Sequence, residues 1–197
     1  EYDGTALTAP TYTITYGETS GTATAGEDGT YSYELSTGDK IVITPAETAT
    51  VTHVAEGTVK NAFSYTLENA DFYSNVTKTE GDLSITPATL TVKTESAEKT
   101  YDGQPLTATG TVTGYKNNET ATFTVTGSQT EVGNSKNTYT LVFNQTAVET
   151  DYTISEDIGT LTVTSDETEL TIVSATDSKE YDGTALTAPT YTITYGE

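Results

Sequence analysis

Residues Thr11 to Tyr16 read Thr-Tyr-Thr-Ile-Thr-Tyr, a strict alternation of threonine with large apolar side chains. In an extended strand successive side chains point to opposite faces, so Tyr12, Ile14 and Tyr16 would share one face and the threonines the other. Threonine is β-branched and suits a half-buried pleated surface better than a helix. The stretch therefore predicts a β-strand with one face in a core and the other in water.

The same alternation recurs along the chain, in which 48 of 197 residues are threonine. Gly-, Asn- and Asp-rich turn signals separate the alternating stretches. Further strands are expected at Tyr31–Leu35, Lys40–Thr44, Thr50–Val54, Phe63–Leu67, Leu83–Thr86, Leu90–Lys93, Thr122–Thr126, Tyr139–Phe143, Leu161–Val163 and Thr168–Thr176. Turns are expected at Gly26–Gly29, Thr37–Asp39, Gly114–Asn118 and Gly133–Asn137.

The chain repeats itself. Glu1–Glu18 read EYDGTALTAPTYTITYGE, and Glu180–Glu197 read the same letter for letter, 179 residues further on. Eighteen identical residues do not arise by chance, so we expect a tandem array with this period, of which the chain is an excised piece. One continuous polypeptide is the favoured form of the array. The alternative joins separate chains, residues 168–197 of one completing residues 1–87 of another by strand donation.

A weaker repeat with an offset of 80 residues lies inside this period. Leu90-Thr91-Val92 and the later Lys99–Gly103 correspond to Leu170-Thr171-Ile172 and Lys179–Gly183. The closing segments Gly81–Thr86 and Gly159–Thr164 also correspond. These matches predict three segments: 1–87, a β domain lacking its first strand, which the preceding repeat supplies; 88–166, a complete β domain; and 167–197, the opening strands of the next copy of the first domain.

Several short strands in each 80–98 residues predict an all-β fold of tandem Ig-like antiparallel sandwiches in an extended rod. A β-grasp unit is the alternative, with one helical turn from Ala46–Val54 or Thr58–Ala62.

The composition of the chain excludes several classes of function. With 29 acidic and 8 basic residues the net charge is −21, which opposes binding to nucleic acid or anionic membranes. The sequence has no cysteine, no arginine and no apolar run of membrane-spanning length. Its one histidine, His53, has no counterpart in the other repeat and is expected on a strand surface. We therefore expect no enzyme activity and no cofactor.

The repeated Lys-x-Tyr-Asp-Gly turn, together with Asp151-Tyr152-Thr153-Ile154 leading into Gly159–Val163, resembles the YDG/MBG-type tandem repeat domains of bacterial cell-surface adhesins. The resemblance covers essentially the whole chain. It implies a secreted, surface-attached protein whose repeats form a stalk or filament, so the expected location is extracellular.

The YDG turns are expected to be structural. Glycine can take the positive φ of a tight turn, aspartate can accept backbone N–H bonds, and tyrosine can plug the end of a sandwich. The residues concerned are Tyr2, Asp3, Gly4, Tyr101, Asp102, Gly103, Tyr181, Asp182 and Gly183.

Three further groups of residues are weaker candidates. Lys99 and Lys179 recur at equivalent places and are the lysines to test for an isopeptide bond to Asn, although a lysine offsetting nearby acids explains the recurrence equally well. Tyr115, in a turn, is the best loop aromatic for contact with a ligand. Calcium at a joint would use acidic pairs, although a solvated surface is favoured: Glu27, Asp28, Glu156, Asp157, Asp166 and Glu167.

The expected function is mechanical: a stalk or filament segment that spaces an adhesive tip from a bacterial cell or forms a fibre. Its partners would be neighbouring copies of the repeat. In the alternative, the repeats themselves bind host glycan or protein as multivalent adhesion modules.

Overall fold

The structure, a computed structural model, describes residues 1–196. These residues form an all-β chain, as predicted, whose helical content consists of three 3₁₀ turns. No helix in residues 1–196 is long and apolar enough to cross a membrane. The turns are η1 (Val54–Glu56), η2 (Ala70–Phe72) and η3 (Glu149–Asp151).

The segment 1–87 holds three small antiparallel sheets. A four-stranded sheet has the order β3-β4-β5-β7, and β1-β2 and β6-β8 are two-stranded. Its core contains Tyr12, Ala23 and Ile43, against which Phe63 and neighbouring aromatic rings pack. The strands are β1 (Thr13–Tyr16), β2 (Thr19–Thr22), β3 (Thr24–Ala25), β4 (Tyr31–Glu34), β5 (Lys40–Pro45), β6 (Val59–Asn61), β7 (Phe63–Leu67) and β8 (Gly81–Leu83).

The segment 88–166 is built around β9, whose alternate residues are buried. Strand β9 pairs antiparallel with β11 and parallel with β15, and a second sheet has the order β10-β16-β13. Strands β12 and β14 form a separate ladder. The bounds are β9 (Ala88–Thr94), β10 (Ala97–Thr100), β11 (Gly110–Thr113), β12 (Thr122–Val125), β13 (Gly133–Lys136), β14 (Tyr139–Val142), β15 (Tyr152–Ile158) and β16 (Thr160–Thr164).

Two of these pairings, β9 with β15 and β10 with β16, are parallel, which differs from the expected purely antiparallel arrangement. The first and last strands of the segment run side by side and change sheet together, β9 continuing into β10 and β15 into β16. At this change of sheet, which we call the crossing, an added Cβ on Gly159 would lie 2.4 Å from the carbonyl carbon and oxygen of Glu95. Only glycine permits this close approach of two backbones.

Buried Asn137 stabilises the crossing. Its Nδ2 donates to the carbonyl oxygens of Glu95 at 2.9 Å and Thr109 at 3.3 Å, and its own N–H donates to the carbonyl of Gly159 at 2.9 Å. The hydroxyl of Thr94 accepts from the N–H of Gly159 at 3.0 Å. Backbone groups that the sheet ladders leave unpaired at the change of sheet are thus satisfied by side chains.

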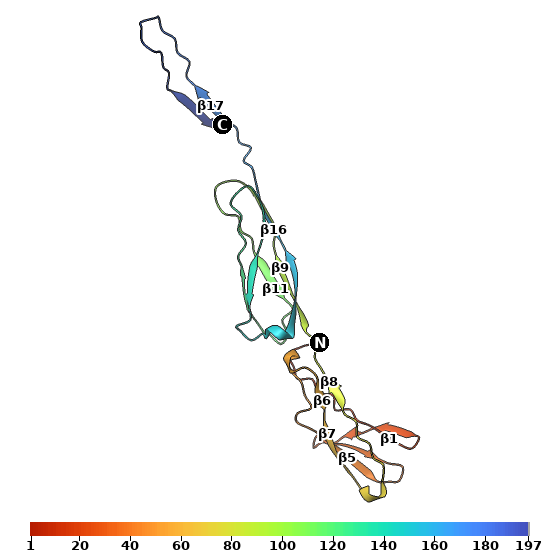
Figure 1. Cartoon of the computed structure of the whole chain (residues 1–197). Helices are drawn as coiled ribbons and strands as arrows, with labels where there is room; N and C mark the ends of the chain where they lie inside the picture. Colours follow the sequence, from red (N-terminus) through yellow and green to blue (C-terminus); the bar gives the residue numbers. More distant parts are fainter. Residues whose placement is uncertain (197) are drawn as a thin grey trace.

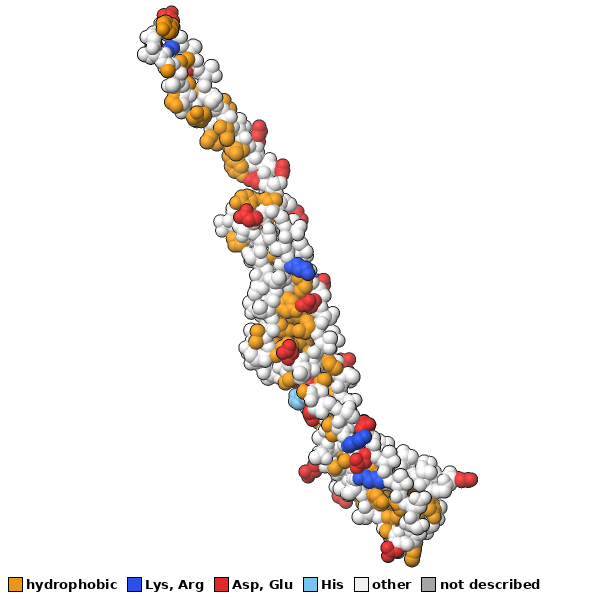
Figure 2. All heavy atoms as spheres, in the orientation of Figure 1, with side chains coloured by type: hydrophobic (Ala, Val, Ile, Leu, Met, Phe, Trp, Pro, Cys, Tyr) orange, Lys and Arg blue, Asp and Glu red, His pale blue; other side chains and the backbone are white. Residues whose placement is uncertain are grey.

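The C-terminal segment is an antiparallel hairpin of β17 (Leu170–Ser174) and β18 (Tyr191–Tyr195). The large apolar side chains of both strands are more than half exposed, among them Leu170, Ile172 and Ile193. Figure 2 shows the resulting row of hydrophobic side chains along this end of the chain. In Figure 1 the three segments follow one another along an elongated molecule, and the N-terminus lies beside the boundary of the first two.

The strand expected at Leu83–Thr86 is displaced to Gly81–Leu83 as β8, and two other local predictions are wrong. The expected strand Thr50–Val54 makes only an isolated bridge between Val51 and Leu7 before η1 begins. The expected turn Gly133–Asn137 is instead strand β13, which pairs with β16. Its Gly-Asn-Ser-Lys sequence has no apolar alternation, because the ladder to β16 rather than side-chain burial holds it in place.

Candidate functional site: the joint at Tyr2

All three YDG turns have the same backbone geometry. The glycines at the third position have φ values of 81°, 75° and 78° at Gly4, Gly103 and Gly183. The preceding aspartate accepts a backbone N–H two residues on, at 2.8 Å for Asp3 and 2.9 Å for both Asp102 and Asp182. The turn is thus a local structure that forms alike in all three places.

The tyrosines of these turns differ in their surroundings. Tyr2 is 1% exposed, Tyr101 is 40% exposed and Tyr181 is 96% exposed. Tyr2 and Tyr181 lie in identical sequence, so neighbouring chain rather than local sequence decides the burial. Tyr2 is buried because it inserts between the segments 1–87 and 88–166.

The ring of Tyr2 packs edge-on against Tyr152, with ring centroids 5.5 Å apart, and stacks on His53 at 6.1 Å. Its hydroxyl donates to Glu119, which also accepts from the hydroxyl of Tyr152 at 2.6 Å. Burial is the larger cause and the hydrogen bond to Glu119 the smaller cause of a raised pKa in both tyrosines. Together they raise the pKa of Tyr2, and they raise the pKa of Tyr152 to about 12. The same core includes Leu90, so apolar burial joins the two segments.

Buried Asp151, in η3, makes the polar contacts of the joint with η1. Its Oδ2 lies 2.6 Å from Nδ1 of His53, and its Oδ1 accepts from the N–H of Val54 at 2.7 Å. The hydrogen bond to Asp151 raises the pKa of His53. His53, expected as an ordinary strand-surface residue, is therefore part of the joint.

Two further contacts lie at the rim of the joint. The Nδ2 of Asn117 donates to the carbonyl of Gly4 at 3.0 Å, and Lys116 pairs with Glu1 at 3.2 Å. We call the set Tyr2, His53, Glu119, Asp151 and Tyr152 the Tyr2 joint. This arrangement fixes the orientation of two successive β segments through a buried aromatic core with paired polar groups.

The recurring lysines pair locally within their turns. The Nζ of Lys99 donates to Asp102 and to the carbonyl of Gln104, both at 2.5 Å. The Nζ of Lys179 lies 2.9 Å from Asp182 and lowers the pKa of that carboxyl to about 2. In the described part of the chain these ammonium groups bond to carboxylate, carbonyl and hydroxyl oxygens rather than to an Asn side chain, so the isopeptide bond stays a prediction.

Tyr115 is not the exposed loop aromatic that the sequence indicated. Its ring packs against the core of the segment 88–166, 6.0 Å from the ring of Tyr152, and its hydroxyl is buried. The turn around it packs closely on β9, since an added Cβ on Gly114 would lie 2.3 Å from the carbonyl oxygen of Thr89. The turn sequence alone did not indicate this packing. Tyr115 thus packs beside the joint, and its contact with a ligand stays a prediction.

The acidic pairs are bonded to near neighbours. Asp28 accepts from the hydroxyl of Thr30 at 2.7 Å, Glu156 from the hydroxyl of Tyr139, and Asp166 from the N–H of Thr168 at 2.9 Å. Glu167 accepts from the hydroxyl of Ser165. Residues 1–196 contain no cluster of three or more metal-ligating side chains. Calcium binding by Glu27, Asp157 and these residues stays a prediction.

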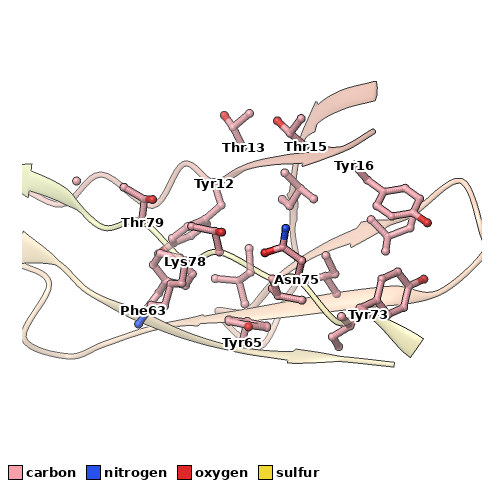
Figure 3. A pocket seen from close by; sticks show the side chains of 18 of the residues that line it. Tyr12, Thr13, Thr15, Tyr16, Phe63, Tyr65, Tyr73, Asn75, Lys78 and Thr79 are labelled. Atoms are coloured by element: carbon pink, nitrogen blue, oxygen red, sulfur yellow. The ribbon is translucent and has the colours of Figure 1, made fainter. Parts of the chain in front are cut away.

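A groove of about 770 Å³ opens beside β1. Strand β1 forms one wall, the unpaired segment 73–79 forms the other, and Phe63 and Tyr65 of β7 lie across from β1. In Figure 3 Tyr12 points toward Phe63, whereas Thr13 and Thr15 point away from the groove. Aromatic and aliphatic side chains line the groove together with threonines and other polar groups. Nothing in the sequence predicted it beyond the expected missing first strand.

Comparisons with protein-family models, with curated proteins and with solved structures found no match.

Proposed function

We propose that the chain is a structural segment of a large extracellular bacterial repeat protein, forming a stalk or filament that spaces an adhesive tip from the cell or builds a fibre. In this proposal the protein acts as a spacer, and the contacts between successive β segments keep that spacer stiff.

The observation that carries the proposal is the Tyr2 joint together with its duplicated sequence. Residues 1–87 and 88–166 are connected through a buried aromatic core and not through a flexible linker. The sequence that supplies Tyr2 returns unchanged at Glu180–Glu197. A second joint of the same kind can therefore form wherever another copy follows, and each added copy would extend the array without new contacts having to evolve.

Charge supports the same proposal. The net charges of residues 1–87, 88–166 and 167–197 are −10, −6 and −5, so negative charge is distributed along the whole chain. Like charges along an array keep it hydrated and oppose both compaction and lateral aggregation.

Electron microscopy of the native material tests the proposal. A filament with a regular axial rise of roughly 70–90 Å per 179 residues is expected, from two β segments each about 35–45 Å long given the reach of their strands. Compact particles without an axial repeat would overturn it.

A further inference from the structure

The segment 88–166 shows what the groove beside β1 lacks. In that segment β9 lies between β11, which is antiparallel to it, and β15, which is parallel. Leu90 and Val92 of β9 are fully buried between these neighbours. This central strand is the one that completes the segment.

The two walls of the groove correspond to β11 and β15. Strand β17 corresponds to β9, and β18, which pairs with it, corresponds to β11. Strand β1 has the same sequence as β18. The segment 73–79 leads into Gly81-Asp82-Leu83 as β15 leads into Gly159-Thr160-Leu161. Within residues 1–87 the strand equivalent to β9 is therefore missing from between two walls that are present.

The hydrogen-bonding edge of β1 matches this missing strand. The carbonyl of Tyr12 accepts from the N–H of Ala23, so the even-numbered residues of β1 direct their backbone groups toward β2. In an antiparallel ladder the alternate residues, Thr13 and Thr15, direct theirs to the opposite edge. The identical residues of β18, Thr192 and Thr194, use these groups to pair with β17, as the flanking bond from the N–H of Gly196 to the carbonyl of Glu169 indicates.

Gly81 provides an independent indication. Its equivalent, Gly159, is tightly packed against the backbone of Glu95, just beyond the end of β9. A Cβ on Gly81, which lines the groove, would have nothing within 4 Å among the described residues. The glycine is present, but the strand that it would pack against is not.

We propose that this groove binds strand Leu170–Ser174 of a second copy of this chain. The strand lies antiparallel to β1 and parallel to the segment 73–79. The register of β17 on β18 places Leu170 opposite Tyr16, Ile172 opposite Ile14, and Ser174 opposite Tyr12. The inference deepens the proposed function, since it names the contact through which copies would join head to tail.

Strand β17 does not reach the groove of its own chain, because the two lie at opposite ends of the molecule with the segment 88–166 between them (Figure 1); the β17 that fills this groove therefore belongs to another copy. On binding, β17 leaves β18 of its own chain and pairs with β1 of the other copy. Because β1 and β18 have the same sequence, each hydrogen bond lost with β18 is replaced by an equivalent bond with β1. Strand β1 stays in place because Tyr2 anchors its chain in the joint. The gain is burial of Leu170 and Ile172, which are 58% and 64% exposed in the free hairpin.

Sedimentation of the 197-residue chain tests the inference, after annealing by brief warming and at about 0.15 M salt, where the screening length is about 8 Å. The wild-type chain is expected to form dimers and longer species as its concentration rises. Leu170→Asp with Ile172→Asp places charge in the groove and should leave monomers. Thr171→Asp with Val173→Asp is the matched control, because the equivalent residues of β9 face solvent. The dissociation constant of this control should lie within about threefold of that of the wild-type chain.

Thr13→Pro removes an N–H from the free edge of β1 without touching the bonds to β2, and should also leave monomers. This variant retains an intact donor strand, and the Leu170→Asp, Ile172→Asp variant retains an intact groove. Mixing the two should therefore give a 1:1 complex and nothing longer, which also shows that both are folded.

A wild-type chain that stays monomeric, equal association of the two aspartate pairs, or a mixture that stays monomeric would each overturn the inference. None of these outcomes changes the axial repeat expected by electron microscopy. The sedimentation experiment therefore tests the inference, and microscopy tests the proposed function independently.

Discussion

Tyr2 and Tyr181 have the same eighteen-residue surroundings in sequence, yet one is 1% exposed and the other 96% exposed. The aspartate and glycine that follow each tyrosine fold identically in both places. At the scale of a residue, the turn is encoded locally, whereas the contribution of its tyrosine to stability depends on the segment that it meets.

Replacing Tyr2 by alanine should destabilise the joint by about 3–5 kcal/mol, the usual range for deleting a large buried aromatic side chain. Tyr181→Ala is the matched control and should change the free energy of unfolding by less than about 0.5 kcal/mol, since the side chain is exposed. Urea unfolding followed by tyrosine fluorescence measures both. Equal effects of the two substitutions would mean that Tyr2 does not connect the segments.

The His53–Asp151 pair makes the joint sensitive to pH. The pKa of His53 is raised above its ordinary value of 6.5 by the bond to Asp151, so the folded state binds the proton more tightly than the unfolded chain. The stabilisation is fully present below pH 6.5 and is lost as the pH rises through the raised pKa.

The measurement is the difference in free energy of unfolding between wild type and His53→Gln across pH 5 to 9. We expect the advantage of wild type to be greatest at the acid end and to shrink as the pH increases. Asp151→Asn should abolish this dependence, because the amide leaves the imidazolium without a partner charge. An advantage that grew with pH would contradict the pairing.

At the scale of elements, the crossing at Gly159 decides how the segment 88–166 is built. Two strands pass together from one sheet to the other, and the absence of a side chain at one glycine lets them touch. Asn137 supplies the hydrogen bonds that the ladders cannot.

Gly159→Ala should destabilise this segment by at least about 2 kcal/mol, because its Cβ would meet backbone atoms of Glu95 that cannot turn away. Gly81→Ala is the matched control and should change stability by less than about 0.5 kcal/mol, since open space surrounds its Cβ. Both are best measured by chemical denaturation in chains carrying the Leu170→Asp, Ile172→Asp pair, in which the groove stays empty. A tolerated alanine at Gly159 would exclude the close crossing.

The same elements show what sequence can predict here. Alternation of threonine with apolar residues located β5, β7 and β9 to within two residues, because burial of one strand face is visible in a single sequence. It missed β13, whose polar residues are held by pairing with β16, and it placed a strand at Thr50–Val54, where η1 begins. Strand pairing between distant segments leaves no period in the sequence.

The candidate site was predictable only in part, for a similar reason. The YDG turn was located by its own residues, since its geometry is local. The roles of His53 and Asp151 were not, because the two residues lie 98 positions apart and meet only through packing of η1 on η3. Tyr115 was misplaced because a turn sequence does not indicate which of its side chains folds inward.

At the scale of the whole molecule, the segments follow one another along an elongated chain (Figure 1). The segments 1–87 and 88–166 meet through few but buried residues, and the sequence that supplies Tyr2 recurs at Glu180–Glu197. Length should therefore be additive in an array of this kind, unlike in a globular protein, where added residues enlarge a common core.

Small-angle X-ray scattering from chains with one, two and four periods of 179 residues tests this most directly. The account predicts that the maximum dimension rises linearly, by roughly 70–90 Å for each period. A radius of gyration that instead grew only as about the 0.38 power of chain length, as in compact proteins, would contradict it.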